Sequence, residues 1–125
     1  MILVDTSVWV NHLRESNQIL AELLDAGMVL SHPFIIGELA LGNLRQRRTV
    51  LNALSDLPAT KVADGAEVLQ FIERRHLFAR GIGYVDAHLL AAVQLTAGAE
   101  LWTNDSRLHR LAVELNLAPS LPRSG

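Results

Sequence analysis

Hydrophobic residues follow two alternating patterns along this chain, short continuous runs and longer stretches with helical periodicity. The apolar runs at residues 2–4, 28–30 and 101–102 have the length and composition of buried strands. Residues 60–63 and the region of Leu117 are weaker strand candidates. Helices are predicted at about residues 7–13, 18–26, 33–44, 47–57, 65–80, 84–97 and 106–115, with Thr6 or Ser7 capping the first.

Strands that alternate with helices, without tight hairpin signals, indicate parallel strands joined by crossover helices. The sequence therefore predicts an α/β fold, a three-layer α/β/α sandwich around a central, mostly parallel sheet of four or five strands. A chain of 125 residues fits one domain, residues 1–125.

Composition narrows the class of protein. Half of the residues are hydrophobic and 19% are charged, which excludes a disordered chain and leaves no segment apolar enough for a membrane span. The apolar start is interrupted early by Asp5, so it is not expected to be a signal peptide. The absence of Cys excludes disulfides and thiolate metal sites and suits a reducing compartment. We expect a cytoplasmic protein without a membrane partner.

Four carboxylates occupy related places in this pattern. Asp5 and Asp105 each follow a short predicted strand, while Glu38 and Asp86 each lie near the start of an apolar helix that follows a loop. In a parallel sheet these four positions meet at one edge, where α/β proteins bind ligands. Carboxylates at one edge repel one another unless a cation intervenes, and oxygen ligands favour Mg²⁺ or Mn²⁺. One or two such ions can activate water for attack on a phosphodiester.

Each carboxylate also has a structural explanation. Asp5 and Asp105 can cap the helices that follow them, and the charge of Asp86 suits the first turn of a helix. The apolar surroundings of Glu38 predict burial, which requires a metal or a partner such as Arg45. Taken singly, each residue is explained without a metal; taken together, they indicate a cation site.

With the four acids in place, the sequence resembles the PIN-domain family, and most closely the VapC-type toxins of bacterial type II toxin–antitoxin systems. The resemblance covers nearly the whole chain. It rests on the order and spacing of four motifs, Val-Asp-Thr-Ser-Val-Trp at 4–9, Gly-Glu-Leu-Ala-Leu-Gly at 37–42, Tyr-Val-Asp-Ala-His-Leu-Leu-Ala-Ala at 84–92, and Leu-Trp-Thr-Asn-Asp at 101–105.

The resemblance implies a metal-dependent endoribonuclease that leaves a 5′-phosphate and a 3′-hydroxyl. It also implies a homodimer and a cognate antitoxin whose C-terminal segment covers the active site. The residues carried over are the acids that would hold Mg²⁺ or Mn²⁺ and three hydroxyl side chains that would support them: Asp5, Glu38, Asp86 and Asp105, with Thr6, Ser7 and Thr103. Among the acids, the position of Asp105 varies in the family.

Charge permits an RNA partner. The net charge is −2, but setting the four acids aside leaves 13 − 4 = 9 acidic residues against 11 Lys and Arg. Arg107 and Arg110 follow Asp105 closely and are the candidate substrate contacts. Two basic clusters, at residues 45–48 and 74–80, either bind phosphates or form solvated helix faces. The positions of Trp9, Trp102 and Tyr84 favour core packing over base stacking.

Two other functions compete with the nuclease. A catalytically inactive PIN-like module would bind RNA or protein, although the presence of all four acids argues against it. A phosphatase of the haloacid-dehalogenase type would need a second Asp two residues after Asp5, where the chain has Ser7.

Overall fold

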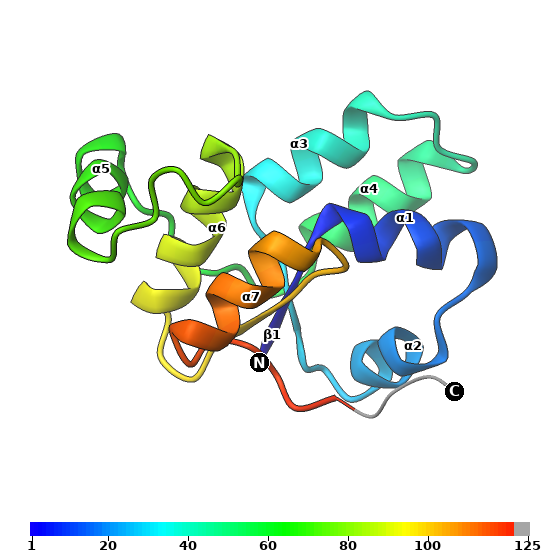
Figure 1. Cartoon of the computed structure of the whole chain (residues 1–125). Coiled ribbons are helices and arrows are strands. Elements are labelled where there is room, and N and C mark those ends of the chain that lie inside the picture. The colour runs from blue at the N-terminus through cyan, green and yellow to red at the C-terminus, as the bar shows by residue number, and fades with distance from the viewer. Residues whose placement is uncertain (122–125) are drawn as a thin grey trace.

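The computed structural model describes residues 1–121, which are arranged around a short parallel sheet (Figure 1). Strands β1 (Ile2–Val4), β2 (Val29–Leu30) and β3 (Glu100–Trp102) are parallel, and β1 lies in the middle in the order β2-β1-β3. The helices are α1 (Thr6–Glu15), α2 (Gln18–Asp25), α3 (Pro33–Leu41), α4 (Arg47–Ser55), α5 (Gly65–Arg74), α6 (Tyr84–Leu95) and α7 (Ser106–Glu114).

The helices enclose the sheet, with α5 and α6 toward one end of the molecule and α1 and α2 toward the other (Figure 1). Leu3 and Val4 of β1 are fully buried, as is Leu101 of β3. They belong to one cluster of buried apolar side chains that extends along the chain from Ile2 to Leu117. Burial of the central strand on both faces explains its continuous apolar sequence and confirms the predicted α/β sandwich.

Strand register brings distant segments together at the carboxyl edge of the sheet. Val4 pairs with Trp102, so Asp5 and Thr103 are the next residues on neighbouring strands. The backbone N–H of Asp5 donates to the carbonyl of Trp102 at 2.9 Å, which extends the ladder to this edge. On the other side Leu3 pairs with Leu30, and the chain continues through Ser31 and His32 into α3.

The sheet has three strands within residues 1–121, fewer than the four or five predicted. Residues 60–63 do not form a strand; a single bridge joins Ala59 to Ser31, and the N–H of Lys61 then bonds to the hydroxyl of Thr96. Leu117 also forms no strand, although its carbonyl accepts the N–H of Leu101 at 2.7 Å. Each segment contributes isolated hydrogen bonds rather than a ladder.

Helix α5 is shorter than predicted, because it ends at Arg74 instead of near Arg80. His76 takes a left-handed conformation with φ 54°, and the N–H of Leu77 donates back to the carbonyl of Ile72. This turn directs Leu77 into the core, where it is 3% exposed. Burial of one leucine therefore outweighs continuation of the helix.

None of the helices described here combines the length and the apolar character that crossing a membrane requires.

Candidate active site

Asp5 lies at the carboxyl edge of the sheet with its side chain turned away from helix capping. It occupies the position before α1, but its carboxylate accepts no hydrogen bond from the helix backbone. Its Oδ2 instead accepts the hydroxyls of Ser7 and Thr103, each at 2.8 Å, and the residue is 7% exposed. The capping explanation is therefore wrong for Asp5, and so is the prediction that Thr6 or Ser7 caps α1.

A hydroxyl network joins Asp5 to the start of α7. The hydroxyl of Thr103 accepts the N–H of Asp105 at 3.0 Å, and that of Ser7 accepts the N–H of Asn104 at 3.0 Å. Each hydroxyl thus donates its hydrogen to Asp5 and accepts an N–H from the loop after β3. No hydrogen bond from residues 1–121 reaches Oδ1 of Asp5, which leaves this oxygen for a ligand.

Glu38 lies on α3 and is solvent-exposed, contrary to its predicted burial. The helix turns Ile35 and Leu39 into the core and leaves Leu41 91% exposed, so its apolar sequence covers more than the buried face. The hydroxyl of Thr6 donates to Oε1 of Glu38 at 2.8 Å. No ion pair with Arg45 is found in the described part of the chain.

Asp86 lies in the first turn of α6, half-buried, and accepts the N–H of Gly83 at 3.3 Å. Burial is the main reason that its pKa is raised above the usual range. The Gly83 hydrogen bond acts in the opposite direction, and the negative charges of Asp5, Asp105 and Glu38 raise the pKa further. All four acids therefore share one electrostatic environment.

Asp105 behaves as the sequence suggests for a helix cap. Its Oδ1 accepts the N–H groups of Arg107 at 2.9 Å and Leu108 at 3.0 Å. The side chain is exposed. For this residue the structural explanation holds, while its charge still contributes to the pKa of Asp86.

The donor chemistry of this edge fits a hard divalent cation, because carboxylate oxygens are the ligands that such ions prefer. Across residues 1–121, however, no three His, Asp or Glu side chains are close enough together to hold a metal ion. The acids thus share an electrostatic environment without forming a ligand cluster. We refer to Asp5, Glu38, Asp86 and Asp105 as the acidic site.

Two buried histidines belong to the helices that carry Glu38 and Asp86, His32 at the start of α3 and His88 within α6. His32 is fully buried and accepts the N–H of Phe34 through Nδ1, which caps α3. Burial, assisted by the nearby His88, lowers the pKa of His32 to about 4, so the ring is neutral at physiological pH. His88 packs against Phe34 and Tyr84, with ring centroids at 4.8 Å and 4.6 Å. Both histidines have packing roles that the sequence does not define.

The arginines predicted as substrate contacts have different surroundings. The side chain of Arg107 crosses the backbone of Gly81, where an added Cβ would lie 2.8 Å from Cδ and 2.9 Å from a guanidinium nitrogen. Arg80 of the second basic cluster forms an ion pair with Glu114 at 2.6 Å, and Arg110 is close enough to help lower the pKa of Glu114 after Arg80. Among these three arginines, only Arg80 forms an ion pair within the described residues, and Arg107 differs from Arg110 in lying against Gly81 instead of near Glu114.

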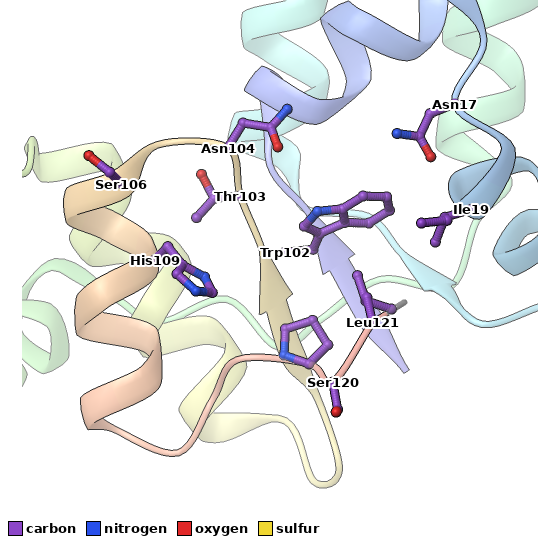
Figure 2. Close-up of a pocket in the computed structure, with 10 residues that line it drawn as sticks. Asn17, Ile19, Trp102, Thr103, Asn104, Ser106, His109, Ser120 and Leu121 are labelled. Carbon is purple, nitrogen blue, oxygen red and sulfur yellow. The ribbon is translucent and has the colours of Figure 1, made fainter. Parts of the chain in front are cut away.

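Two cavities flank the acidic site. One of about 450 Å³ lies between α1 and α3 and is lined by Glu38, Val10, Leu13 and Arg45, among others. The other, of about 660 Å³, lies beside the end of β3 and includes Trp102 and Thr103 (Figure 2). Thr103 belongs both to the second cavity and to the hydrogen-bond network on Asp5.

Backbone groups at this edge are not identified by the sequence. The N–H groups of Gly83 and Asn104 bond to Asp86 and Ser7, and the bare backbone of Gly81 accommodates Arg107. Gly81 and Gly83 do interrupt the pattern before α6, which marks a loop but gives no sign of what the loop contacts.

The sequence of this chain is similar to a known protein family and to named proteins. Residues 2–114 match the family model described as PIN domain. The chain is 48% identical over 118 residues to the protein named Ribonuclease VapC32 of Mycobacterium tuberculosis, both in strain CDC 1551 / Oshkosh and in strain ATCC 25618 / H37Rv. The matched region covers 94% of this chain and 95% of that relative.

Proposed function

The chain belongs to the PIN-domain family, within its VapC-type members, and from this premise we propose that it is a metal-dependent endoribonuclease and the toxin of a toxin–antitoxin pair. The observation that carries the proposal is the side chain of Asp5. Its carboxylate does not cap the helix, is held by Ser7 and Thr103, and keeps one oxygen without a hydrogen bond from residues 1–121. At the same edge, burial and then the charges of Asp5, Asp105 and Glu38 raise the pKa of Asp86. The ribonuclease name of a relative that is 48% identical supports the reaction class.

Asp5, Glu38, Asp86 and Asp105 are the residues that would hold Mg²⁺ or Mn²⁺. Such an ion, when bound, supplies a hydroxide from water and stabilises the oxygens of an in-line displacement at phosphorus. The products of that reaction would be a 5′-phosphate and a 3′-hydroxyl. The pKa of Asp86 is raised by burial first and by the charges of Asp5, Asp105 and Glu38 after it, and a cation would relieve the repulsion among these charges.

The chain's own residues orient the site in this proposal. Thr6, Ser7 and Thr103 hold two carboxylates through their hydroxyls, which fixes the direction of the oxygens left for a ligand. Arg107 supplies a positive charge beside Asp105 for the phosphate backbone of RNA, and Arg110 one turn later supplies a weaker one because it lies near Glu114.

Partners follow from the same family. We infer a cognate antitoxin that covers the active site, and the 450 Å³ cavity supports this because Glu38 of the acidic site shares its walls with Val10, Leu13 and Arg45. Val10 is 42% and Leu13 40% exposed, as expected for apolar residues that a partner covers. A homodimer and a cytoplasmic location complete the proposal, and the mass of the purified chain in solution tests the dimer.

An RNA cleavage assay tests the function directly. Wild-type protein with Mg²⁺ or Mn²⁺ is expected to cut single-stranded RNA, excess chelator to stop the reaction, and added metal to restore it. The variant Asp5→Asn keeps the side-chain volume but loses a ligand oxygen, so cleavage should fall by at least a hundredfold with the fold intact. Undiminished cleavage by Asp5→Asn, or in excess chelator, would refute the proposal.

The alternative is a PIN-like module that binds RNA or protein without cleaving it. The spacing of the acids favours this alternative, since no three of them form a metal-ligand group within residues 1–121. The two functions separate in one experiment, because a binding module retains RNA in a gel-shift assay with metal present and leaves it uncut.

A further inference from the structure

The cavity beside the end of β3 has features of a binding site that the reaction chemistry does not use. Its volume of about 660 Å³ falls within the range of about 300–1,000 Å³ that is usual for small-molecule sites. In Figure 2 the indole of Trp102 extends from the end of β3 toward Asn17 and Ile19, and His109 of α7 lies on the other side of the strand end. The aromatic ring of Trp102 thus lies in a wall that contains both polar and apolar side chains.

Within residues 1–121, the wall of this cavity contains no charged side chain. None of the ten described residues that line it is Asp, Glu, Lys or Arg. A phosphate or another strongly charged group would find no counter-charge there. The cavity therefore suits an uncharged ligand with a flat apolar face and hydrogen-bonding edges.

Amide side chains offer such hydrogen bonds. Asn17 uses its Oδ1 to cap α2 by accepting the N–H of Leu20 at 3.0 Å, which leaves its two N–H groups available as donors. The side chain of Asn104 is exposed and has no hydrogen bond to any residue of the described part of the chain. The amide of Asn17 is held in place by its bond to α2, whereas the amide of Asn104 can rotate to suit a ligand.

Trp102 is placed differently from the other tryptophan. Trp9 is 5% exposed and belongs to the hydrophobic core. Trp102 is half-buried and packs against that core from outside its buried cluster. The prediction that Trp9, Trp102 and Tyr84 favour core packing is therefore right for Trp9, incomplete for Trp102 and wrong for Tyr84, which is 52% exposed. A half-buried indole can receive a stacking partner.

The cavity and the acidic site share residues. Thr103 lines the cavity and donates to Asp5, and Asn104 lines the cavity while its N–H donates to Ser7. The cavity therefore adjoins the acidic site through the loop that follows β3. We propose that this cavity is a nucleobase subsite, in which one base of the RNA next to the cleaved bond stacks on Trp102 and is read by Asn17 and Asn104. This inference rests on the proposed function, since it takes RNA as the substrate.

Tryptophan fluorescence tests the stacking directly. The probe is a short single-stranded RNA, which is added to the full-length wild type or to a single variant. Excess chelator is present, so that binding is measured without cleavage. Wild type and Trp9→Phe should both lose fluorescence on binding, because each retains Trp102. Trp102→Phe should bind the RNA with unchanged fluorescence. Quenching that persists in Trp102→Phe would overturn the proposal.

Abasic substitution identifies the base. When each nucleotide of the RNA is replaced in turn by an abasic one, a single position should weaken binding to wild type by roughly tenfold, the size expected for one lost stack. In Trp102→Leu the intact RNA should bind as weakly as the abasic RNA does to wild type. A scan in which no position matters, or in which Trp102→Leu remains equally sensitive, would overturn the subsite.

Asn104→Ala provides a second variant if Trp102→Leu fails to fold, since the Asn104 side chain is exposed and bonds to nothing in the described chain. This variant should discriminate less than wild type among the four bases at the sensitive position. Its tryptophan fluorescence should still be quenched by RNA as strongly as that of wild type. An unchanged preference would remove Asn104 from recognition.

The outcome is separable from the fate of the nuclease proposal. If wild type cleaves RNA with metal but no base is sensed by Trp102, the subsite fails and the nuclease stands. If Trp102 senses a base but wild type never cleaves RNA, the subsite stands and the nuclease fails.

Discussion

Individual hydroxyl groups determine what Asp5 can do in this protein. A carboxylate before a helix normally accepts backbone N–H groups, as Asp105 does with Arg107 and Leu108. Asp5 does not take this role, because the hydroxyls of Ser7 and Thr103 donate hydrogen bonds to its carboxylate. Asp5 and Asp105 each precede a helix, and they differ through the hydroxyl groups that bond to Asp5.

Thr103→Val tests that distinction. The change keeps the side-chain shape but removes a donor to Asp5 and an acceptor for Asp105. RNA cleavage should fall by about 10- to 100-fold, the usual cost of losing an outer-shell partner. The free energy of unfolding should fall by only about 1–2 kcal/mol, measured by urea denaturation. Thr103→Ser retains the hydroxyl and should stay close to wild type; equal cleavage by Thr103→Val and wild type would show that the hydroxyl does not orient Asp5.

Helix ends and turns position the four acids. Some of these elements can be predicted from the sequence, and others cannot. Short apolar strands and capping residues predict β1, β3, the starts of α2, α3 and α7, and the meeting of strand ends at one edge. Hydrophobicity alone could not place Glu38, because an apolar helix such as α3 can expose Leu41 as well as bury Ile35. Which face is buried depends on packing against α4, which follows α3 directly, and against α1, which is separated from it by α2 and β2.

Side-chain direction at the acidic site was likewise beyond the sequence. The motifs identify Asp5 and Thr103, but the bond between them spans 98 residues and exists only through the pairing of β1 with β3. The same limit applies to Gly81, where a loop glycine is visible in the sequence while its contact with Arg107 is not.

His32→Asn tests the cap of α3 through pH. The pKa of His32 is lowered from 6.5 to about 4 in the folded chain, so between these values the unfolded chain binds a proton that the folded chain does not. The free energy of unfolding of wild type should therefore fall as the pH drops from 6.5 to 4. Asn preserves a capping oxygen without titrating, so the variant should lose less stability over this range in urea denaturation.

His76→Asn is the matched control for that experiment. His76 is exposed and has a left-handed conformation that Asn tolerates. It should reproduce the wild-type dependence on pH. If His32→Asn shows the same dependence, the buried histidine is not its source.

Gly81→Ala tests the turn before α6. The residue has φ +83°, and a Cβ would lie 2.8 Å from Cδ of Arg107, so the change should cost roughly 1–2 kcal/mol of stability and displace the arginine. RNA affinity in chelator should fall about as far as in Arg107→Ala. Gly98→Ala shares the positive φ, at +72°, but meets no neighbouring atom, so it should lose stability without losing RNA affinity. Equal RNA affinity for Gly81→Ala and Gly98→Ala would mean that Gly81 does not position Arg107.

At the scale of the whole molecule, folding gathers acids that lie up to 100 positions apart into one electrostatic environment. Asp86 registers this directly, since burial and the charges of Asp5, Asp105 and Glu38 all raise its pKa. A parallel sheet with helices on its faces produces such an edge without any continuous motif. The neighbouring cavities then provide room for a partner beside Glu38 and for a base beside Trp102.

The central claim is that this edge binds a divalent cation, and Mn²⁺ binding measured by electron paramagnetic resonance tests it most directly. The full chain should bind Mn²⁺, and Asp5→Asn and Asp86→Asn should each weaken that binding by at least tenfold. Mg²⁺ should displace the bound Mn²⁺. Equal Mn²⁺ affinity in wild type and both variants, or no Mn²⁺ bound to a wild-type chain that cleaves RNA, would contradict it.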